Sequence, residues 1–437
     1  MNRYRQILAS MDYPIFGAVL LLSIIGILSI FSSNVNAEGV IVSTDYLKQI
    51  IWALIGLASL LALVGVDYRQ LKDYSIYLYF LVIAALIYTR FFGKIVNGAR
   101  SWLGIGDFGV QPSEFMKIAA ILLLARYLDN SEHEGDVMRI AKSLGIILLP
   151  VRLILLAPDL GSSLVFFPIL FFMLVVAGIQ RRMLVFMLLV VAIMIGFTIL
   201  PLWEKYILPR PTGFLLLFYQ SPYDLILLGV VAIVVALALW GQMSFKKSFY
   251  YWISYFSLAF GIGLALSIVA HKVLKEYQVM RLIVFLDPSI DPRGSGWNII
   301  QSITAIGSGG FFGRGFLAGP QSHNSYIPQQ STDFIFSIIA EEWGFIGGLV
   351  VFALFGLLLF RFAAIMEAVR DRYATYIVAG VMGMIFFHFM INSGMAMGIM
   401  PITGIPLLFL SYGGSSLLTV MAAIGIVLGI SARRYHS

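Results

Sequence analysis

The chain has 437 residues, of which 60% are hydrophobic and 12% are charged, and its formal net charge is +7. Soluble domains carry about 25% charged residues, so this composition excludes a soluble enzyme and predicts a polytopic membrane protein. The absence of cysteine excludes disulfides and thiolate chemistry. The positive charge is typical of the positive-inside bias of membrane proteins. The chain has no basic domain outside the membrane, so the sequence does not indicate nucleic-acid binding.

Apolar runs of about 17–25 residues predict about twelve membrane-spanning helices. The expected spans are residues 14–33, 47–66, 74–91, 112–127, 143–157, 160–178, 183–202, 223–240, 249–270, 334–360, 374–395 and 405–430. The fifth run is short and ends near Pro158, which favours a break within the membrane over a simple hairpin. The predicted fold is therefore an all-α polytopic membrane protein with a large extracytoplasmic loop at 271–333.

Basic residues set the expected orientation. With a cytoplasmic N-terminus, every cytoplasmic turn receives lysine or arginine, and the C-terminus is also cytoplasmic. The remaining basic residues fall in outer loops and nearby helix ends: Lys94, Arg100, Lys117, Lys205, Arg210, Lys272, Lys275, Arg281, Arg293 and Arg314. Positive charge on the outer side requires a reason, and an anionic ligand provides one.

The first polar cluster lies around the fourth span. Pro112 and Glu114 are typical of a helix start. Glu114 and Lys117 are three residues apart and share a helix face. They form either a local ion pair or a site where Lys117 meets a phosphate or a carboxylate. Arg100 and Trp102 are compatible with an interfacial anchor or with a lipid-phosphate contact.

A second cluster lies at the break after the fifth span. Asp159 either caps the following helix or faces a polar cavity, since a carboxylate in lipid is costly. Arg152 lies mid-helix and is expected either to pair with a buried acid or to extend toward the membrane surface.

The loop at 271–333 is the strongest candidate for chemistry, because long loops without regular structure are usually functional. Asp287 and Asp291 each precede a proline, which favours extended backbone. Gly294 and Gly296 permit tight turns. The two Asp-Pro units are either ordinary turns or a constrained carboxylate site. Four further side chains supply hydrogen-bond donors near this site: Gln278, Arg281, Gln301 and Ser302.

Two polar stretches follow the loop. Glu341 lies about 12 Å deeper than Asp333 by helical rise, and it is either functional or part of a structural network with Lys117 or Arg152. Near the C-terminus, the small residues around Ser415 indicate close helix packing with some cavity lining.

Together these strings resemble the SEDS family of shape, elongation, division and sporulation proteins, and the short N-terminal tail is more similar to its RodA branch than to its FtsW branch. The matches occur in family order: N-G-A-R-S-W (97–102), Q-P-S-E-x-x-K (111–117), P-D-L-G-S-S (158–163), D-P-R-G-S-G-W-x-x-x-Q-S (291–302), T-D-F-I-F…E-E-W-G-F-I-G (332–347) and G-I-P-L-L-F-L-S-Y-G-G-S (404–415). They cover nearly the whole chain apart from one region.

The resemblance implies a peptidoglycan glycosyltransferase of the bacterial inner (cytoplasmic) membrane that polymerises lipid II during cell elongation. It also implies a class B penicillin-binding protein as partner. The family's catalytic aspartate maps onto Asp291, and its acid and base pair maps onto Glu114 and Lys117.

One region departs from the family pattern. The family usually has about ten helices, whereas residues 203–252 look like an insertion of extra helices. Two added helices keep the 271–333 loop on its family side of the membrane, and one would place it in the cytoplasm.

The expected chemistry is an inverting displacement at the anomeric carbon of the donor. Asp291, with Asp287 as the fallback, takes a proton from the acceptor hydroxyl. Four basic residues hold the departing diphosphate: Arg100, Lys117, Arg281 and Arg293. The remaining candidate substrate-binding residues are Trp102, Asp159, Gln278, Gln301, Ser302 and Ser415.

The sequence shows no dedicated metal site, although Mg²⁺ or Mn²⁺ suits carboxylates and phosphates. Two other functions fit a chain with many helices and intramembrane charges. One is a flippase or transporter of a lipid-linked cell-wall precursor. The other is an inert scaffold of a cell-wall complex.

Overall fold

A computed structural model describes residues 10–96, 99–105, 108–207, 215–274, 276–292, 294–324, 326 and 328–434. The chain divides into two compact units, one of residues 1–178 and 298–437 and one of residues 179–297. Of the described helices, nine are long and apolar enough to cross a membrane. The protein is a multi-pass helical membrane protein, as its composition predicts.

The first unit begins with helices α2 (Tyr13–Ser33), α3 (Asp45–Gly65) and α4 (Tyr68–Phe92). Asp12 caps α2 by accepting a hydrogen bond from the Ile15 amide, and a proline in the first turn fits the helix start. A three-stranded antiparallel sheet follows, of β1 (Lys94–Val96), β2 (Ala99–Ile105) and β3 (Phe108–Val110). This sheet was not predicted from the sequence.

The next helices are α5 (Pro112–Asn130), α6 (Asp136–Leu156), α7 (Leu160–Leu164) and α8 (Phe166–Val176). The predicted break after the fifth span is confirmed, because α6 ends at Leu156 and the short α7 begins at Leu160. Counted with α5, α6 and the α7–α8 pair, the long described helices match the twelve predicted spans.

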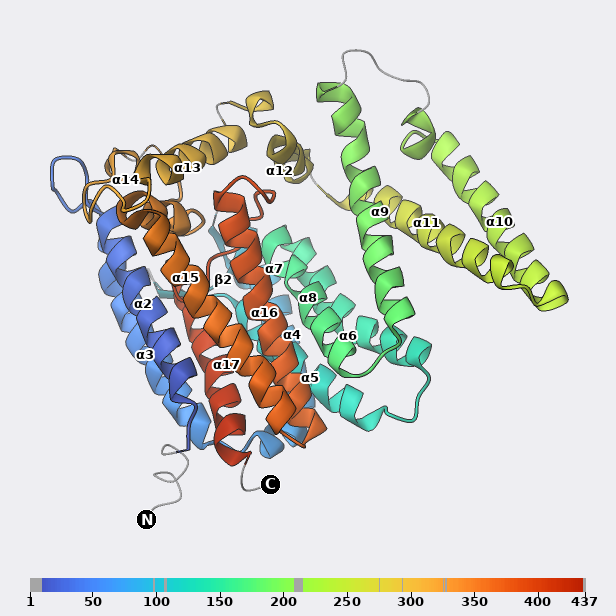
Figure 1. The fold of residues 1–437 in the computed structure, drawn as a ribbon, viewed down its shortest axis with the longest axis horizontal. Helices are drawn as coiled ribbons and strands as arrows, with labels where there is room; N and C mark the ends of the chain where they lie inside the picture. Colours follow the sequence, from blue (N-terminus) through green and yellow to red (C-terminus); the bar gives the residue numbers. More distant parts are fainter. Residues whose placement is uncertain are drawn as a thin grey trace. The chain divides into compact units, whose positions relative to one another are not determined.

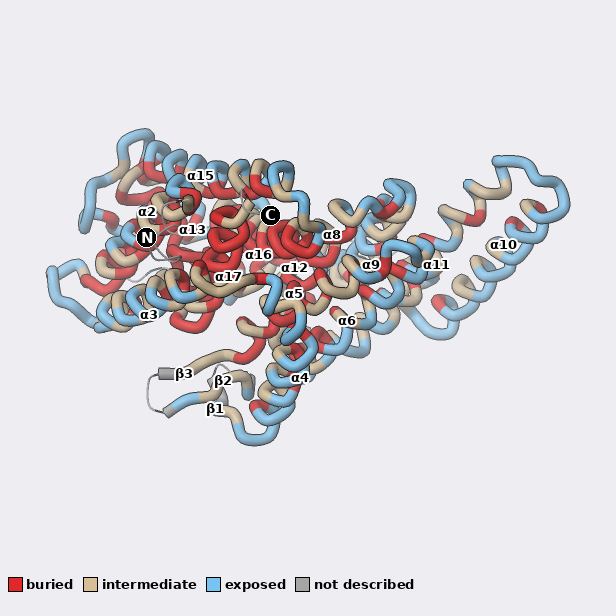
Figure 2. Tube along the Cα trace, turned by 90° about the horizontal axis from the view of Figure 1, so that it is seen from below, coloured by how far each residue is buried: buried red, intermediate tan, exposed pale blue. Residues whose placement is uncertain are grey.

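The chain returns to the first unit through α13 (Ser295–Gly309) and α14 (Pro320–His323), followed by α15 (Ile335–Ala368), α16 (Arg372–Ala396) and α17 (Gly414–Arg433). Helix α17 packs along α3, and α16 packs against α5, α8 and α15 (Figure 1). Helices α16 and α17 are mostly buried (Figure 2) and form the core of this unit. Helix α17 begins at Gly414, nine residues later than predicted, because residues 401–413 form an irregular segment that contains two prolines.

The second unit contains α9 (Arg181–Tyr206), η1 (Leu215–Phe218), α10 (Tyr223–Phe245), α11 (Ser248–Val273), α12 (Glu276–Leu286) and η2 (Pro288–Ile290). Helix α11 packs against both α9 and α10 (Figure 1). The predicted insertion, residues 203–252, contains η1, α10 and parts of α9 and α11. Its status as an insertion remains a prediction.

The segment at 271–333 is not a loop without regular structure. It contains α12, η2, α13 and α14. The glycine-rich composition of this segment made α13 hard to predict, because three of its fifteen residues are glycine.

Candidate functional site

The fourth-span residues form a buried ion pair in the first unit. Lys117 Nζ lies 2.7 Å from Glu114 Oε1, and both side chains are almost completely buried. The helix start at Pro112 places the pair in the first two turns of α5. The predicted ion pair is therefore present. Its possible contact with substrate remains a prediction.

A histidine completes this cluster. The Nε2 atom of His388, on α16, is 3.1 Å from Lys117 Nζ. The Nδ1 atom of the same ring is 2.9 Å from the carbonyl oxygen of Pro406. This contact was not predicted from the sequence, because 271 residues separate His388 from Lys117. Only the packing of α16 on α5 brings them together.

Gln111, just before α5, joins two predicted site residues, Asp159 and Ser415. Its side-chain nitrogen donates to Asp159 Oδ2 at 2.8 Å, and its amide donates to Ser415 Oγ at 2.9 Å. The other oxygen of Asp159 accepts the Ser162 amide at 3.0 Å. Asp159 therefore caps α7, as one reading of the sequence expected. Gln111 itself belongs to the Q-P-S-E motif but was not predicted as a site residue.

The break at 157–160 is held against the segment before α17. A Cβ added at Gly161 would lie 2.7 Å from the backbone oxygen of Thr403, so only glycine fits there. The cluster joins three separate parts of the first unit, because Asp159 precedes α7, Gln111 precedes α5 and Ser415 lies at the start of α17. This cluster and the Glu114–Lys117 pair both lie at the start of α5.

Arg100 and Trp102 lie on β2, apart from this cluster. Arg100 is exposed, and its Nη1 donates to the Phe91 carbonyl at the end of α4, at 3.1 Å. Trp102 lies close to Gly109 of β3. No hydrogen bond or ion pair among the described residues joins either side chain to Glu114 or Lys117. Their observed contacts lie within the sheet and at the end of α4, and both the interfacial anchor and the lipid-phosphate contact remain predictions.

Ser302 joins three helices of the first unit. Its Oγ donates to the Ala396 carbonyl at 2.6 Å. Because a hydroxyl has one proton, Ser337 Oγ must be the donor in the second bond, at 2.5 Å. Both contacts are internal, and Ser302 is fully buried. The neighbouring Gln301 is half-buried.

The acids of the E-E-W-G motif organise a loop of the first unit. Glu341 accepts hydrogen bonds from the amides of Gln321 and Ser322, at 2.8 and 3.1 Å. Glu342 accepts from the Ser32 hydroxyl and from the Leu317 amide. The expected network from Glu341 to Lys117 or Arg152 is therefore wrong. Its described partners belong to the loop that precedes α15.

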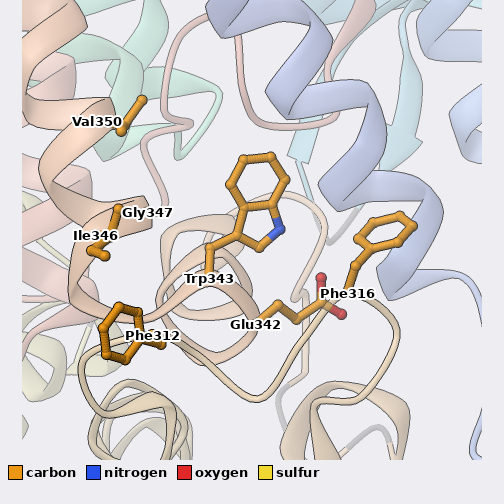
Figure 3. A pocket seen from close by; sticks show the side chains of 7 residues that line it. All are labelled: Phe312, Phe316, Glu342, Trp343, Ile346, Gly347 and Val350. Atoms are coloured by element: carbon orange, nitrogen blue, oxygen red, sulfur yellow. The ribbon is translucent and has the colours of Figure 1, made fainter.

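Gly344 explains the conformation of this loop. Its φ of 66° interrupts α15, which leaves the carbonyls of the preceding residues without helical partners. The Glu341 and Glu342 carbonyls instead accept the amides of Arg314 and Gly315, both at 2.9 Å. Phe312, Phe316 and Trp343 line an open pocket of about 360 Å³ beside this joint, together with Glu342, Ile346, Gly347 and Val350 (Figure 3).

In the second unit, Asp287 and Asp291 flank η2. Asp287 Oδ1 accepts the amide and the hydroxyl of Ser289, at 2.9 and 2.6 Å. These hydrogen bonds lower the pKa of Asp287 below its ordinary value. The bond from the Ser289 hydroxyl has the larger effect, and the bond from the Ser289 amide has the smaller one. Asp287 therefore caps η2 and is engaged locally.

Asp291 follows η2 and is half-buried. Its backbone oxygen accepts the amides of Gly294 and Gly296, at 3.3 and 3.1 Å. A Cβ at Gly294 would collide with the Asp291 carboxylate, and one at Gly296 would collide with the Pro288 carbonyl. The two glycines thus allow the chain to wrap closely around Asp291, as the D-P-x-G-x-G pattern suggested.

Gln278 and Arg281 lie three residues apart on α12, which packs against η2. Gln278 is buried, and Arg281 is half-buried. The second unit therefore contains Asp291, Gln278 and Arg281, the last two on the helix that packs against η2. Arg293 lies outside the described residues.

Comparisons with known proteins show what the chain is similar to. The chain matches the family model of FtsW, RodA and SpoVE, described as cell cycle proteins, over residues 13–221 and 225–436. It is 48% identical to the peptidoglycan glycosyltransferase RodA of Treponema pallidum, covering 97% of this chain and 98% of that one. It is 31% identical to the peptidoglycan glycosyltransferase MrdB of Escherichia coli K12, covering 87% and 83% of the two chains.

Solved structures share the fold. One, from a peptidoglycan synthase complex that coordinates polymerization and crosslinking, matches with a TM-score of 0.67 and 27% identity, covering 98% of this chain and 99% of that one. The rod shape determining protein RodA of Thermus thermophilus matches with a TM-score of 0.59 and 24% identity, covering 98% of each chain.

Proposed function

Because this chain belongs to the FtsW, RodA and SpoVE family of cell cycle proteins, we propose that it polymerises lipid II into glycan strands during cell elongation, with Asp291 as general base. The chain is a peptidoglycan glycosyltransferase, the activity that its relatives from T. pallidum and E. coli carry in their names. The observation that carries this conclusion is the 48% identity to RodA over 97% of the chain.

The backbone around Asp291 supports its role as the base. A Cβ at Gly294 would collide with the Asp291 carboxylate, and a Cβ at Gly296 would collide with the Pro288 carbonyl, so both glycines support the observed conformation of this turn. Asp287, the fallback base, is bound by Ser289 through one of its oxygens. In the proposed reaction, Asp291 takes the proton from the acceptor hydroxyl, whose oxygen attacks the anomeric carbon of the donor as the bond to the diphosphate breaks.

The departing diphosphate needs positive charge, because negative charge develops on it in the transition state. Arg281 lies on the helix that packs against η2. Lys117, Arg100 and Arg293 are the other cations assigned to this task. Mg²⁺ or Mn²⁺ would suit the same diphosphate. Among the described residues, no group of three or more acidic or histidine side chains forms a metal site.

A class B penicillin-binding protein is the proposed partner, and the inner (cytoplasmic) membrane is the proposed location, with both termini in the cytoplasm. The structural match to a synthase complex that coordinates polymerization and crosslinking supports a crosslinking partner. Basic residues in every predicted cytoplasmic turn support the orientation.

The test is polymerisation of purified lipid II in detergent, where no membrane sidedness exists. We expect wild-type protein to make glycan strands, with more product when the partner transpeptidase is present. Asp291→Asn and Asp291→Ala should lose activity by at least about 100-fold, the lower range for loss of a general base. The folded state is checked by size-exclusion chromatography and thermal unfolding.

The outcome separates the alternatives. A flippase would make no polymer in detergent, and an inert scaffold would tolerate loss of the acids at 287 and 291. Normal glycan strands from the Asp291 variants would refute the base assignment. Loss of activity in Asp287→Asn alone would transfer that role to Asp287.

A further inference from the structure

His388 is fixed by two contacts of different kinds. Its Nδ1 faces the Pro406 carbonyl at 2.9 Å, and its Nε2 faces the Lys117 ammonium at 3.1 Å. Both His388 and Lys117 are 1% exposed. The Glu114–Lys117 ion pair does not require a histidine at position 388, and the family motifs quoted above do not require one there either.

The two contacts determine the tautomer of the ring. A carbonyl oxygen only accepts hydrogen bonds, so the proton must be on Nδ1. An ammonium only donates, so Nε2 must present its lone pair to Lys117. A doubly protonated ring would set two donors against each other. The neutral Nδ1–H form therefore fits both partners.

This arrangement orients the Lys117 ammonium. Its three N–H bonds are tetrahedral, and two of them point to Glu114 Oε1 and His388 Nε2. Two fixed acceptors determine the direction of the third N–H. No hydrogen bond from Lys117 to another described residue uses that third donor.

We propose that His388 is a positioning residue for glycosyl transfer, which holds Lys117 so that its third N–H donates to an anionic oxygen of the substrate. The chemical class of that ligand is a phosphate or diphosphate ester. The inference rests on the proposed function, since it names what Lys117 needs in order to act.

The test compares substitutions at position 388 in the detergent polymerisation assay. His388→Gln retains an amide that can donate to Pro406 and an oxygen that can accept from Lys117. His388→Phe keeps a ring of similar shape but makes neither contact. We expect His388→Phe to lower kcat about 10- to 100-fold, the range for losing a hydrogen bond to a charged group, with little change in KM. His388→Gln should stay within about threefold of wild type.

Asn392→Leu is the matched structural control. Asn392 lies one turn later on α16 and donates to the Ile405 carbonyl at 2.8 Å, so it anchors the same irregular segment without touching Lys117. We expect this variant to lower Tm but to keep its kcat per folded molecule.

Three results would overturn the positioning role. They are full activity of His388→Phe, equal losses in His388→Phe and His388→Gln, or a similar kcat loss in Asn392→Leu. Wild-type protein that makes no polymer would instead contradict the proposed function, and this inference with it.

Discussion

At the scale of single residues, the buried Glu114–Lys117 pair allows structure and catalysis to be separated. Removing one partner leaves an uncompensated buried charge, which costs about 3–5 kcal/mol, whereas replacing both with apolar groups is often nearly neutral. We expect Lys117→Met to lower Tm strongly and the double variant Glu114→Leu/Lys117→Met to recover most of it. Neither variant should polymerise lipid II. Recovered activity in the stable double variant would assign the pair a structural role only.

Asp287 provides a pH prediction at the same scale. Because its pKa is lowered, its hydrogen bonds stabilise η2 above the ordinary carboxyl pKa and are lost only as pH falls through the lower value. We therefore expect Asp287→Asn, whose amide oxygen still accepts from Ser289, to keep activity within about threefold of wild type. The acid side of its pH–rate profile should coincide with that of wild type. A displaced profile would show that Asp287 titrates during turnover.

At the scale of elements, the glycine at 294 and the glycine at 307 predict different effects of an alanine substitution on polymerisation. A methyl group at position 294 collides with the Asp291 carboxylate, which must turn away, whereas Gly307 on α13 has nothing within 4 Å of an added Cβ. We expect Gly294→Ala to reduce polymerisation strongly without unfolding the protein. Gly307→Ala should be neutral or should stabilise α13 by about 0.5–1 kcal/mol. Equal activities of the two variants would show that the Asp291 side chain need not keep its orientation.

The helices and strands also show which parts of the fold could be predicted from the sequence. Long apolar runs located the spanning helices, because that signal is local and repeated over many residues. The short sheet at 94–110 and the helices α12–α14 were missed, since glycines and charges mask their periodicity. His388 was missed for another reason. Its partner lies 271 residues away, and no local pattern reports a contact that only helix packing creates.

At the scale of the whole molecule, the membrane crossings determine which side Asp291 faces. The helices before it are α2, α3, α4, α5, α6, the α7–α8 pair, α9, α10 and α11. This is an odd number of crossings, so a cytoplasmic N-terminus places Ser289 and Asp291 on the outer side. The proposed insertion is compatible with this result only if it contributes an even number of crossings.

Single-cysteine labelling tests the orientation directly, because the chain has no cysteine of its own. Ser289 and His133 are both exposed. An odd number of crossings precedes Ser289, whereas an even number precedes His133. In intact cells, a membrane-impermeant maleimide should label Ser289→Cys, whereas His133→Cys should react only after permeabilisation. The reverse pattern would place Asp291 in the cytoplasm, where its proposed role in building glycan strands outside the membrane would fail.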